Sequence, residues 1–303
     1  MLALFGPTAT GKSAIAHAVA RELGGEVVVA DPFQRYRGLE IAADSPRPAD
    51  TAEVPYHLVG DLDLSEDSSA GEFAERAHAA VDAVIRTGRV PIVAGGTGLY
   101  LRAALCRLQM RPPPDSEVRR WAEDLARDPA AALRELEARD PAAAAGIDRA
   151  NPRRVVRALE RAAMGDGQAG ESIWLAPYRV PTLLVCVDRP REVVNDLIRA
   201  RVGREIAEGL RGELERALDH PDLSRGPAQV IGMREVAAIR EGLMDESALE
   251  DALAARTRRL ARMQRTWMRR MAPDVLIDLG DGAAEHAVSR IVSAWRRARE
   301  GVG

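Results

Sequence analysis

The chain is almost devoid of lysine. Of its 43 basic residues only Lys12 is a lysine, and every other one is an arginine. Any chemistry that needs a side-chain amine is therefore excluded everywhere except at residue 12. A strong arginine bias has left lysine at the one position where a compact ammonium suits better than a planar guanidinium.

Cysteine and long apolar runs are also scarce. Cys106 and Cys186 lack the spacing of metal ligands, which excludes a cysteine metal site and favours two reduced thiols in the core. No run approaches the length of a membrane span, and the N-terminus has no basic segment followed by an apolar one. We therefore expect a cytoplasmic protein without a membrane partner.

The chain also has no large excess of positive or negative charge. The formal net charge is −3, which gives no general argument for binding nucleic acid, so any RNA site must be a local patch. A chain of 303 residues with 46% hydrophobic and 29% charged residues is typical of a soluble globular protein. We expect one large domain plus an insertion, acting as a monomer.

The most specific motif lies close to the N-terminus. Gly6-Pro7-Thr8-Ala9-Thr10-Gly11-Lys12-Ser13 fits the phosphate-loop pattern of Gly, four residues and Gly-Lys-Ser/Thr. An apolar strand at residues 1–5 and a helix at 14–23, ended by Gly24-Gly25, are predicted around it. The glycines let successive backbone N–H groups turn around a phosphate at the positive end of that helix. Lys12 supplies a point charge and Ser13 a hydroxyl for Mg²⁺, and a glycine turn without phosphate is the alternative.

Asp31 is the second candidate site residue. It ends the β-branched run at residues 26–31, which is typical of a buried parallel strand whose carboxyl end opens on a site. From the residues alone, this carboxylate either serves such a site or caps the turn at Pro32-Phe33.

Strands and helices alternate in this part of the chain. Residues 73–86 have helical apolar spacing, and residues 89–94 form another buried strand. The Gly95-Gly96-Thr97-Gly98 segment that follows indicates either close backbone approach to a ligand or a plain tight turn. The pattern predicts an α/β fold, with a P-loop NTPase-like, doubly wound parallel sheet as its core.

A helical segment interrupts this alternation. After Pro112-Pro113-Pro114, residues 116–164 are almost wholly helical in pattern, with breaks at Asp128-Pro129, Asp140-Pro141 and Asn151-Pro152. Strand character returns at residues 180–188. We therefore divide the chain into a first core part (1–112), an all-helical insertion domain (113–175) and a second core part with C-terminal helices (176–303).

Three further segments carry weaker signals. Residues 41–55 are rich in Ala, Asp and Pro and predict a surface loop. Residues 199–217 predict one amphipathic helix. Residues 165–170 look like a flexible connector.

Arginines gather at two places. Those of the insertion include positions three and four apart, so several share a helix face: Arg149, Arg153, Arg154, Arg157 and Arg161. Residues 256–270 carry seven more around Trp267. Such a density can bind a pyrophosphate or an RNA backbone, although a solvated arginine face is the usual meaning of such a run.

Taken together, these residues resemble the tRNA dimethylallyltransferases, also called tRNA isopentenyltransferases. The similarity runs from residue 4 to about residue 270 and rests on separated motifs in the family's order. They are Gly6-Pro7-Thr8-Ala9-Thr10-Gly11-Lys12-Ser13, Asp31-Pro32-Phe33-Gln34-Arg35-Tyr36-Arg37-Gly38, Val54-Pro55-Tyr56-His57-Leu58, Gly95-Gly96-Thr97-Gly98-Leu99-Tyr100, Arg154-Val155-Val156-Arg157-Ala158-Leu159-Glu160, Ile231-Gly232 and Thr257-Arg258-Arg259-Leu260-Ala261-Arg262-Met263-Gln264-Arg265-Thr266-Trp267.

The resemblance implies a reaction and a set of residue roles. A dimethylallyl group would pass from dimethylallyl diphosphate to the exocyclic amine of the adenosine just 3′ of the tRNA anticodon, with Mg²⁺ as cofactor and the anticodon stem-loop as partner. The phosphate loop, residues 6–13, would bind the prenyl diphosphate rather than ATP, with Ser13 as metal ligand. Asp31 would be the catalytic base, acting with Lys12 and Thr8. The implied tRNA contacts are Asp31, Pro32, Phe33, Gln34, Thr97, Arg119, Arg153, Arg154 and Arg157.

The chain departs from the family pattern at three places, and other functions stay open. Pro32 stands where the family usually has Ser, Arg153 where it usually has Gln, and Ala42-Ala43-Asp44-Ser45-Pro46 replaces a Gly-Thr-x-Lys-Pro segment. The alternatives are a P-loop small-molecule kinase, an adenylate isopentenyltransferase acting on free nucleotides, and a non-catalytic RNA-binding protein. Consumption of ATP or of dimethylallyl diphosphate would separate the first from the predicted activity.

Overall fold

The computed structural model describes the chain apart from residues 109–113, 150, 166–172, 283 and 301–303 and the side chains of residues 153 and 285. The predicted connector at 165–170 therefore lies almost entirely outside the described residues. The chain forms two compact units, one of residues 1–108 with 176–303 and the other of residues 109–175.

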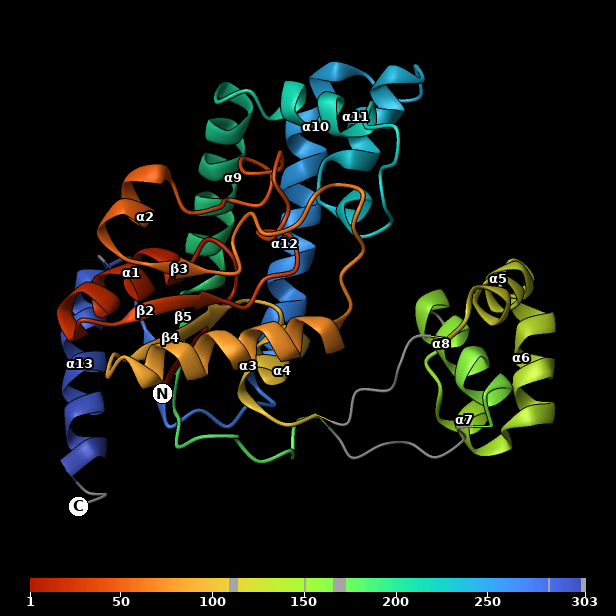
Figure 1. Cartoon of the computed structure of the whole chain (residues 1–303). Helices are drawn as coiled ribbons and strands as arrows, with labels where there is room; N and C mark the ends of the chain where they lie inside the picture. The colour runs from red at the N-terminus through yellow and green to blue at the C-terminus, as the bar shows by residue number, and fades with distance from the viewer. Residues whose placement is uncertain (109–113, 150, 166–172, 283, 301–303) are drawn as a thin grey trace. The chain divides into compact units, whose positions relative to one another are not determined.

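A six-stranded sheet forms the centre of the first unit (Figure 1). Its strands are β1 (Leu2–Phe5), β2 (Glu26–Val29), β3 (Tyr56–His57), β4 (Pro91–Gly95), β5 (Leu183–Asp188) and β6 (Val275–Asp278). They lie in the order β3-β2-β4-β1-β5-β6, and every neighbouring pair is parallel, with Leu2 beside both Ile92 and Leu183. The predicted parallel α/β core is confirmed.

The central strands are short apolar runs because helices cover both of their faces. All residues of β1 and β4 are buried, which gives continuous rather than alternating hydrophobicity. One face packs on α1 (Lys12–Leu23) and α13 (Glu285–Glu300) through residues such as Leu4 and Ile291. The helices α3 (Ala70–Arg86) and α4 (Gly98–Leu105) pack on each other and on β2 and β4 (Figure 1).

The remaining helices of this unit lie beyond the carboxyl ends of the strands or beside β3 (Figure 1). They are α2 (Pro48–Glu53), α9 (Arg191–Ala207), α10 (Leu210–Leu218), α11 (Met233–Arg240) and α12 (Leu249–Met268), with short 3₁₀ helices at Pro227–Gln229 and Glu246–Ala248. A second apolar cluster joins α9, α10, α11 and α12 through residues that include Ile198, Leu214, Val236 and Leu253.

Two sequence predictions in this region were wrong. Residues 41–55 are not all loop, because α2 begins at Pro48 behind an extended Arg47. Residues 199–217 are not one helix, because α9 ends at Ala207 and α10 begins at Leu210. Between them Gly209 has φ 101°, a left-handed conformation that turns the chain and breaks the helical pattern.

The described residues of the second unit form four helices around their own small core. They are α5 (Ser116–Leu125), α6 (Pro129–Arg139), α7 (Pro141–Gly146) and α8 (Pro152–Ala163). Each predicted break is a helix start, in which Asp128, Asp140 or Asn151 caps the helix and proline takes its first position. Leu136 and Leu159 are fully buried in this core.

The two cysteines behave as the composition predicts. Both cysteines are buried free thiols, and burial raises the pKa of Cys106 to about 11 and of Cys186 to about 12. Among the described residues, no helix is long and apolar enough to cross a membrane.

Candidate active site

The phosphate loop leaves β1 at the centre of the sheet, and its two glycines act differently. Gly11 has φ 89° and precedes α1, so it uses the left-handed conformation that glycine adopts without strain. Gly6 has no left-handed conformation. Glycine is required there by space, because a Cβ atom would lie 2.6 Å from the carbonyl oxygen of Val187. Ala9 takes the second left-handed position of the loop, with φ 62°.

Hydrogen bonds from distant segments fix the shape of this loop. The Thr10 hydroxyl donates to the Pro7 carbonyl at 2.8 Å, and Arg189 Nε donates to the Thr10 carbonyl at 3.1 Å. The Thr8 backbone N–H donates to Gln264 Oε1 of α12 at 2.8 Å. The loop is therefore held by the end of β5 and by α12 as well as by its own turns.

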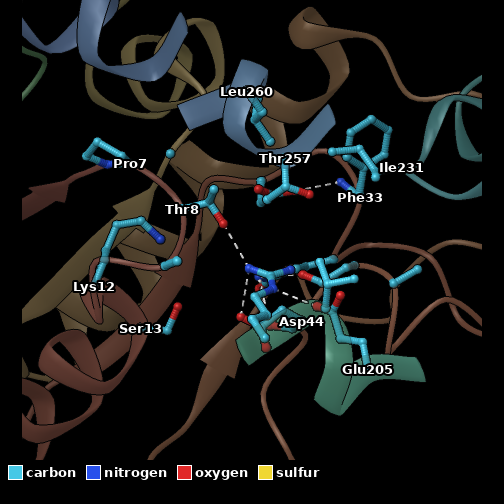
Figure 2. A pocket seen from close by; sticks show the side chains of 18 of the residues that line it. Pro7, Thr8, Lys12, Ser13, Phe33, Asp44, Glu205, Ile231, Thr257 and Leu260 are labelled. Atoms are coloured by element: carbon cyan, nitrogen blue, oxygen red, sulfur yellow. Dashed lines mark hydrogen bonds and ion pairs between the residues drawn. The ribbon is translucent and has the colours of Figure 1, made fainter. Parts of the chain in front are cut away.

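A cavity of about 440 Å³ opens beside the loop. Of the predicted site residues, Pro7, Thr8, Ala9, Gly11, Lys12, Ser13, Asp31, Phe33 and Gln34 line it. Figure 2 shows Thr8, Lys12 and Ser13 together, with Asp44 and Glu205 nearby. The carboxyl ends of β1 and β2 thus bring the phosphate loop and Asp31 to one place, as a parallel sheet allows.

Lys12 and Asp31 are close enough to influence each other's protonation. Burial lowers the pKa of Lys12 below its ordinary value, against the attraction of Asp31 and Asp44. Burial raises the pKa of Asp31 above its ordinary value, against the hydrogen bond from Phe33 and the charge of Lys12. The cavity therefore holds a carboxylate whose affinity for a proton exceeds that of an ordinary aspartate.

Asp31 also makes the local contact that the alternative interpretation predicted. Its Oδ1 accepts a hydrogen bond from the Phe33 backbone N–H at 2.9 Å. The side chain therefore caps the following turn and lines the cavity at the same time. This contact fixes the carboxylate in one orientation.

Four charged residues of the cavity were missed from the sequence, namely Asp44, Arg201, Arg204 and Glu205. Arg201 of α9 donates to the Thr8 hydroxyl at 2.8 Å, and it forms ion pairs with Asp44 at 3.1 Å and with Glu205 at 2.6 Å. Glu205 could have been found, because it lies four residues after Arg201 on a helix. Asp44 carried no such signal, since tertiary folding alone brings it to α9.

The cavity has an apolar side as well. Residues of α9, α12 and the segment before α11 contribute Leu197, Ile231, Leu253 and Leu260 to its lining. Figure 2 shows Ile231, Leu260 and Phe33 in the same cavity as Lys12. Charged groups and hydrocarbon therefore meet there, which suits a ligand with an ionic head and a short apolar tail.

Other predicted site residues lie elsewhere. Gly6, Thr10, Pro32 and Thr97 are not among the lining residues that the structure describes, although Gly96, next to Thr97, is one. Gly96 approaches Gln264 so closely that a Cβ atom would lie 2.5 Å from its Nε2. Gly96 thus packs closely against α12 while it lines the cavity.

The predicted tRNA-binding arginines belong to the second unit. Arg119 and Arg157 both approach the buried carboxylate of Glu160, at 3.9 and 2.9 Å, and Arg154 lies 3.8 Å from Asp148. The side chain of Arg153 lies outside the described residues. In α12, Arg256 forms an ion pair with Glu235, and Arg265 forms one with Asp188. These two arginines therefore stabilise the fold.

The cavity offers few of the oxygen ligands that Mg²⁺ prefers. Among the described residues, no group of three or more His, Cys, Asp or Glu side chains could hold a metal ion. The Ser13 hydroxyl lines the cavity, and Mg²⁺ is commonly bound by one or two protein oxygens together with substrate phosphates. The residues therefore fit an ion that arrives with a diphosphate.

Comparisons with known proteins show the family of the chain. The family described as IPP transferase matches residues 34–271. A tRNA dimethylallyltransferase of Kineococcus radiotolerans is 40% identical over 280 residues, covering 89% of this chain and 88% of that protein. One from Deinococcus radiodurans is 37% identical over 278 residues, covering 88% and 89%.

Solved structures extend the likeness to the fold. The tRNA isopentenylpyrophosphate transferase of Bacillus halodurans superposes with a TM-score of 0.75 and 29% identity, covering 99% of this chain and 96% of that one. A eukaryotic dimethylallyltransferase acting on tRNA shares the fold, with a TM-score of 0.75 and 22% identity, covering 95% and 77%. The family match over residues 34–271 and relatives of 37–40% identity over most of the chain show that the chain belongs to the IPP transferase family.

Proposed function

We propose that this chain is a tRNA dimethylallyltransferase, which moves a dimethylallyl group from dimethylallyl diphosphate to the exocyclic amine of the adenosine 3′-adjacent to the anticodon. The observation that carries the proposal is that Lys12 and Asp31 line one cavity, which also has an apolar side. A prenyl diphosphate has an anionic head and a hydrocarbon tail, and an adenine amine needs a base. The cavity offers Lys12 to the anionic head, apolar side chains to the tail and Asp31 to the amine.

The phosphate loop and its neighbours bind the diphosphate in this proposal. Loop N–H groups, Lys12 and Arg201 face the charge that accumulates as the allylic C–O bond breaks, which is the largest kind of stabilisation that such a site can supply. Thr8 positions Arg201 through its hydroxyl. Mg²⁺, held by Ser13 and the phosphate oxygens, would supply further positive charge to the leaving group.

Asp31 acts as the general base. The nitrogen of the adenine amine forms a bond to the allylic carbon, the electron pair of the C–O bond leaves with diphosphate, and the amine proton passes to the Asp31 carboxylate. The raised pKa of Asp31 favours this step, since a base with greater proton affinity accepts the proton more readily. The hydrogen bond from Phe33 keeps the carboxylate in place.

The tRNA is recognised through its phosphates and through the reacting base. We propose that the anticodon stem-loop contacts Pro32, Phe33, Gln34, Thr97, Arg119, Arg153, Arg154 and Arg157, with the adenine unstacked so that its amine can reach Asp31. Exposed arginines in and just after α12 support the proposal, because Arg259 and Arg262 of the helix and Arg270 beyond its end have no carboxylate partner among the described residues. We further propose that the enzyme works as a monomer in the cytoplasm.

Incubation with labelled dimethylallyl diphosphate and total tRNA tests the proposal. We expect label in the tRNA, on the adenosine 3′-adjacent to the anticodon, and release of pyrophosphate. Label on free adenine nucleotides instead would identify an adenylate isopentenyltransferase. Consumption of ATP with no use of dimethylallyl diphosphate would identify a kinase and overturn the proposal.

A further inference from the structure

The backbone at Asp44 is held in a conformation that is unusual for a residue with a side chain. Its φ is 51°, in the left-handed region, which is uncommon outside glycine and is often retained at functional sites. The Gln34 side-chain amide donates to the carbonyls of Ala43 and Asp44, each at 3.2 Å. The Glu213 carboxylate accepts from the N–H groups of Ile41 and Ala42, at 3.0 and 2.8 Å. The segment is therefore anchored on both sides and presents Asp44 to the cavity.

The Asp44 carboxylate lies against two arginines of α9. Its Oδ2 is 3.1 Å from Arg201 Nη1, and its Oδ1 is 3.6 Å from Arg204 Nη2. The same Arg201 Nη1 donates to the Thr8 hydroxyl. The Arg201 side chain is 17% exposed and that of Asp44 42%, so the carboxylate is the more accessible member of the pair.

The charges around the cavity are balanced. Among the described residues, its lining holds three cationic and three anionic side chains, namely Lys12, Arg201 and Arg204 with Asp31, Asp44 and Glu205. A diphosphate carries several negative charges, so it binds best where positive charge is in excess. Of the three carboxylates, Glu205 is almost fully buried and Asp31 is assigned to the base, which leaves Asp44 as the one that a ligand can displace.

We propose that Asp44 is an internal anion, which occupies Arg201 and gives it up when the diphosphate of the substrate binds. Asp44 thereby weakens the binding of the substrate diphosphate and hastens the release of pyrophosphate. It stands in the 42–46 segment where this chain departs from the family pattern. The inference rests on the proposed function, because it requires a diphosphate in this cavity.

Titration of the purified full-length chain with inorganic pyrophosphate tests the inference. The variants are Asp44→Asn and Asp44→Gly, since asparagine and glycine both tolerate a positive φ. Without Mg²⁺ we expect each to bind pyrophosphate about tenfold more tightly, as removal of one nearby like charge from a partly exposed site allows. Stopped-flow measurement should show slower pyrophosphate dissociation, and thermal melting checks that each variant is folded.

The matched control is Glu208→Gln. Glu208 has nearly the same exposure as Asp44, 40%, and also approaches Arg204, at 3.9 Å, but it does not line the cavity. We expect its pyrophosphate affinity to stay within twofold of the unchanged chain. In an Arg201→Ala background, Asp44→Asn should have less effect than in the unchanged chain, because the displaced partner is gone.

The possible outcomes distinguish failure of this inference from failure of the proposed function. Equal or weaker pyrophosphate binding by both folded Asp44 variants overturns the inference. Weaker binding only in the presence of Mg²⁺ would assign Asp44 to the metal instead, and would also overturn it. Failure of the unchanged chain to bind pyrophosphate, with Lys12→Ala no different, overturns the proposed function and this inference with it.

Discussion

Arginine is held in two contrasting ways in this protein. In the cavity, Arg201 is 17% exposed and is fixed by contacts of 2.6 to 3.1 Å to Glu205, Thr8 and Asp44. In the helical unit, Arg119, Arg154 and Arg157 are 38%, 65% and 45% exposed. Arg119 and Arg154 reach their carboxylate partners only at 3.9 and 3.8 Å, whereas Arg157 lies 2.9 Å from Glu160.

This difference in burial and pairing indicates which arginines suit catalysis and which suit phosphate binding. A charge that stabilises a bond-breaking step must be in position beforehand, so its freedom is lost on folding. Exposed, loosely paired arginines keep their hydration and their rotamer freedom, and they add little to stability. They are suited to polyanion phosphates, whose binding is dominated by counterion release. Substitutions in the two regions should therefore give effects of different kind and size.

The largest effect is expected at Lys12. Lys12→Ala should abolish turnover, because the loop loses its point charge for the diphosphate, and Lys12→Arg should not restore it, because a planar guanidinium does not replace a compact ammonium. Single-turnover rates and pyrophosphate titrations measure the loss. Near-normal activity of the alanine variant would remove the phosphate loop from the mechanism.

Asp31→Asn should lower the single-turnover rate by about 10²- to 10⁴-fold while tRNA affinity stays within a few fold. The unchanged enzyme should lose activity as the pH falls through the raised pKa of Asp31, and the variant should lack this dependence. Loss of tRNA binding with an unchanged single-turnover rate would make Asp31 structural.

The substitution Asp31→Asn should also change the stability of the protein in a predictable direction. The folded-state pKa of Asp31 is raised by burial, so the folded state binds its proton more tightly than the unfolded state does. Burying the ionised form therefore costs stability at neutral pH, and this cost disappears as the pH falls below the ordinary aspartate pKa. Asp31→Asn should melt at or above the temperature of the unchanged protein at pH 7, and a clear decrease would contradict this assignment.

A smaller effect is expected for the exposed arginines. Alanine at Arg119, Arg154 or Arg157 should lower the slope of log tRNA affinity against log salt by roughly 0.7 to 0.9 each and leave pyrophosphate binding unchanged. Arg154 is the cleanest site, because removing Arg157 also takes a partner from the buried Glu160. Arg127→Ala, which removes an 82% exposed arginine from the same unit, is the control. Unchanged slopes for all three would place the RNA elsewhere.

The smallest effect is expected from a helix cap in the second unit. Asp128 accepts hydrogen bonds from the N–H groups of Ala130 and Ala131 at 2.9 and 3.1 Å, so Asp128→Ala should cost about 1 kcal/mol of stability. Pyrophosphate affinity should not change, because none of the described lining residues comes from residues 109–175. Calorimetric melting and the same titration measure both quantities. A change in pyrophosphate affinity would show that the two units are coupled.

The parts predicted from the sequence are those with local causes. The phosphate loop, the helices that begin with a proline and the central strands each depend on neighbouring residues, so their patterns can be recognised in the sequence. The Arg201 and Asp44 pair depends on packing between α9 and a segment far away in sequence, and no local pattern indicates it. The edge strand β3 escaped prediction because a run of two residues is too short to show a period. The edge strand β6 was also not predicted, although it is as long as β1 and β2.

The single lysine makes the protein a convenient subject for covalent labelling. An acylating reagent finds only one ε-amine in the whole chain, and that amine lines the cavity. The lowered pKa of Lys12 increases the fraction of its neutral, nucleophilic form at a given pH. The extent of acylation, read by mass spectrometry of the peptide that contains residue 12, therefore reports how much of the cavity is occupied, without any introduced probe.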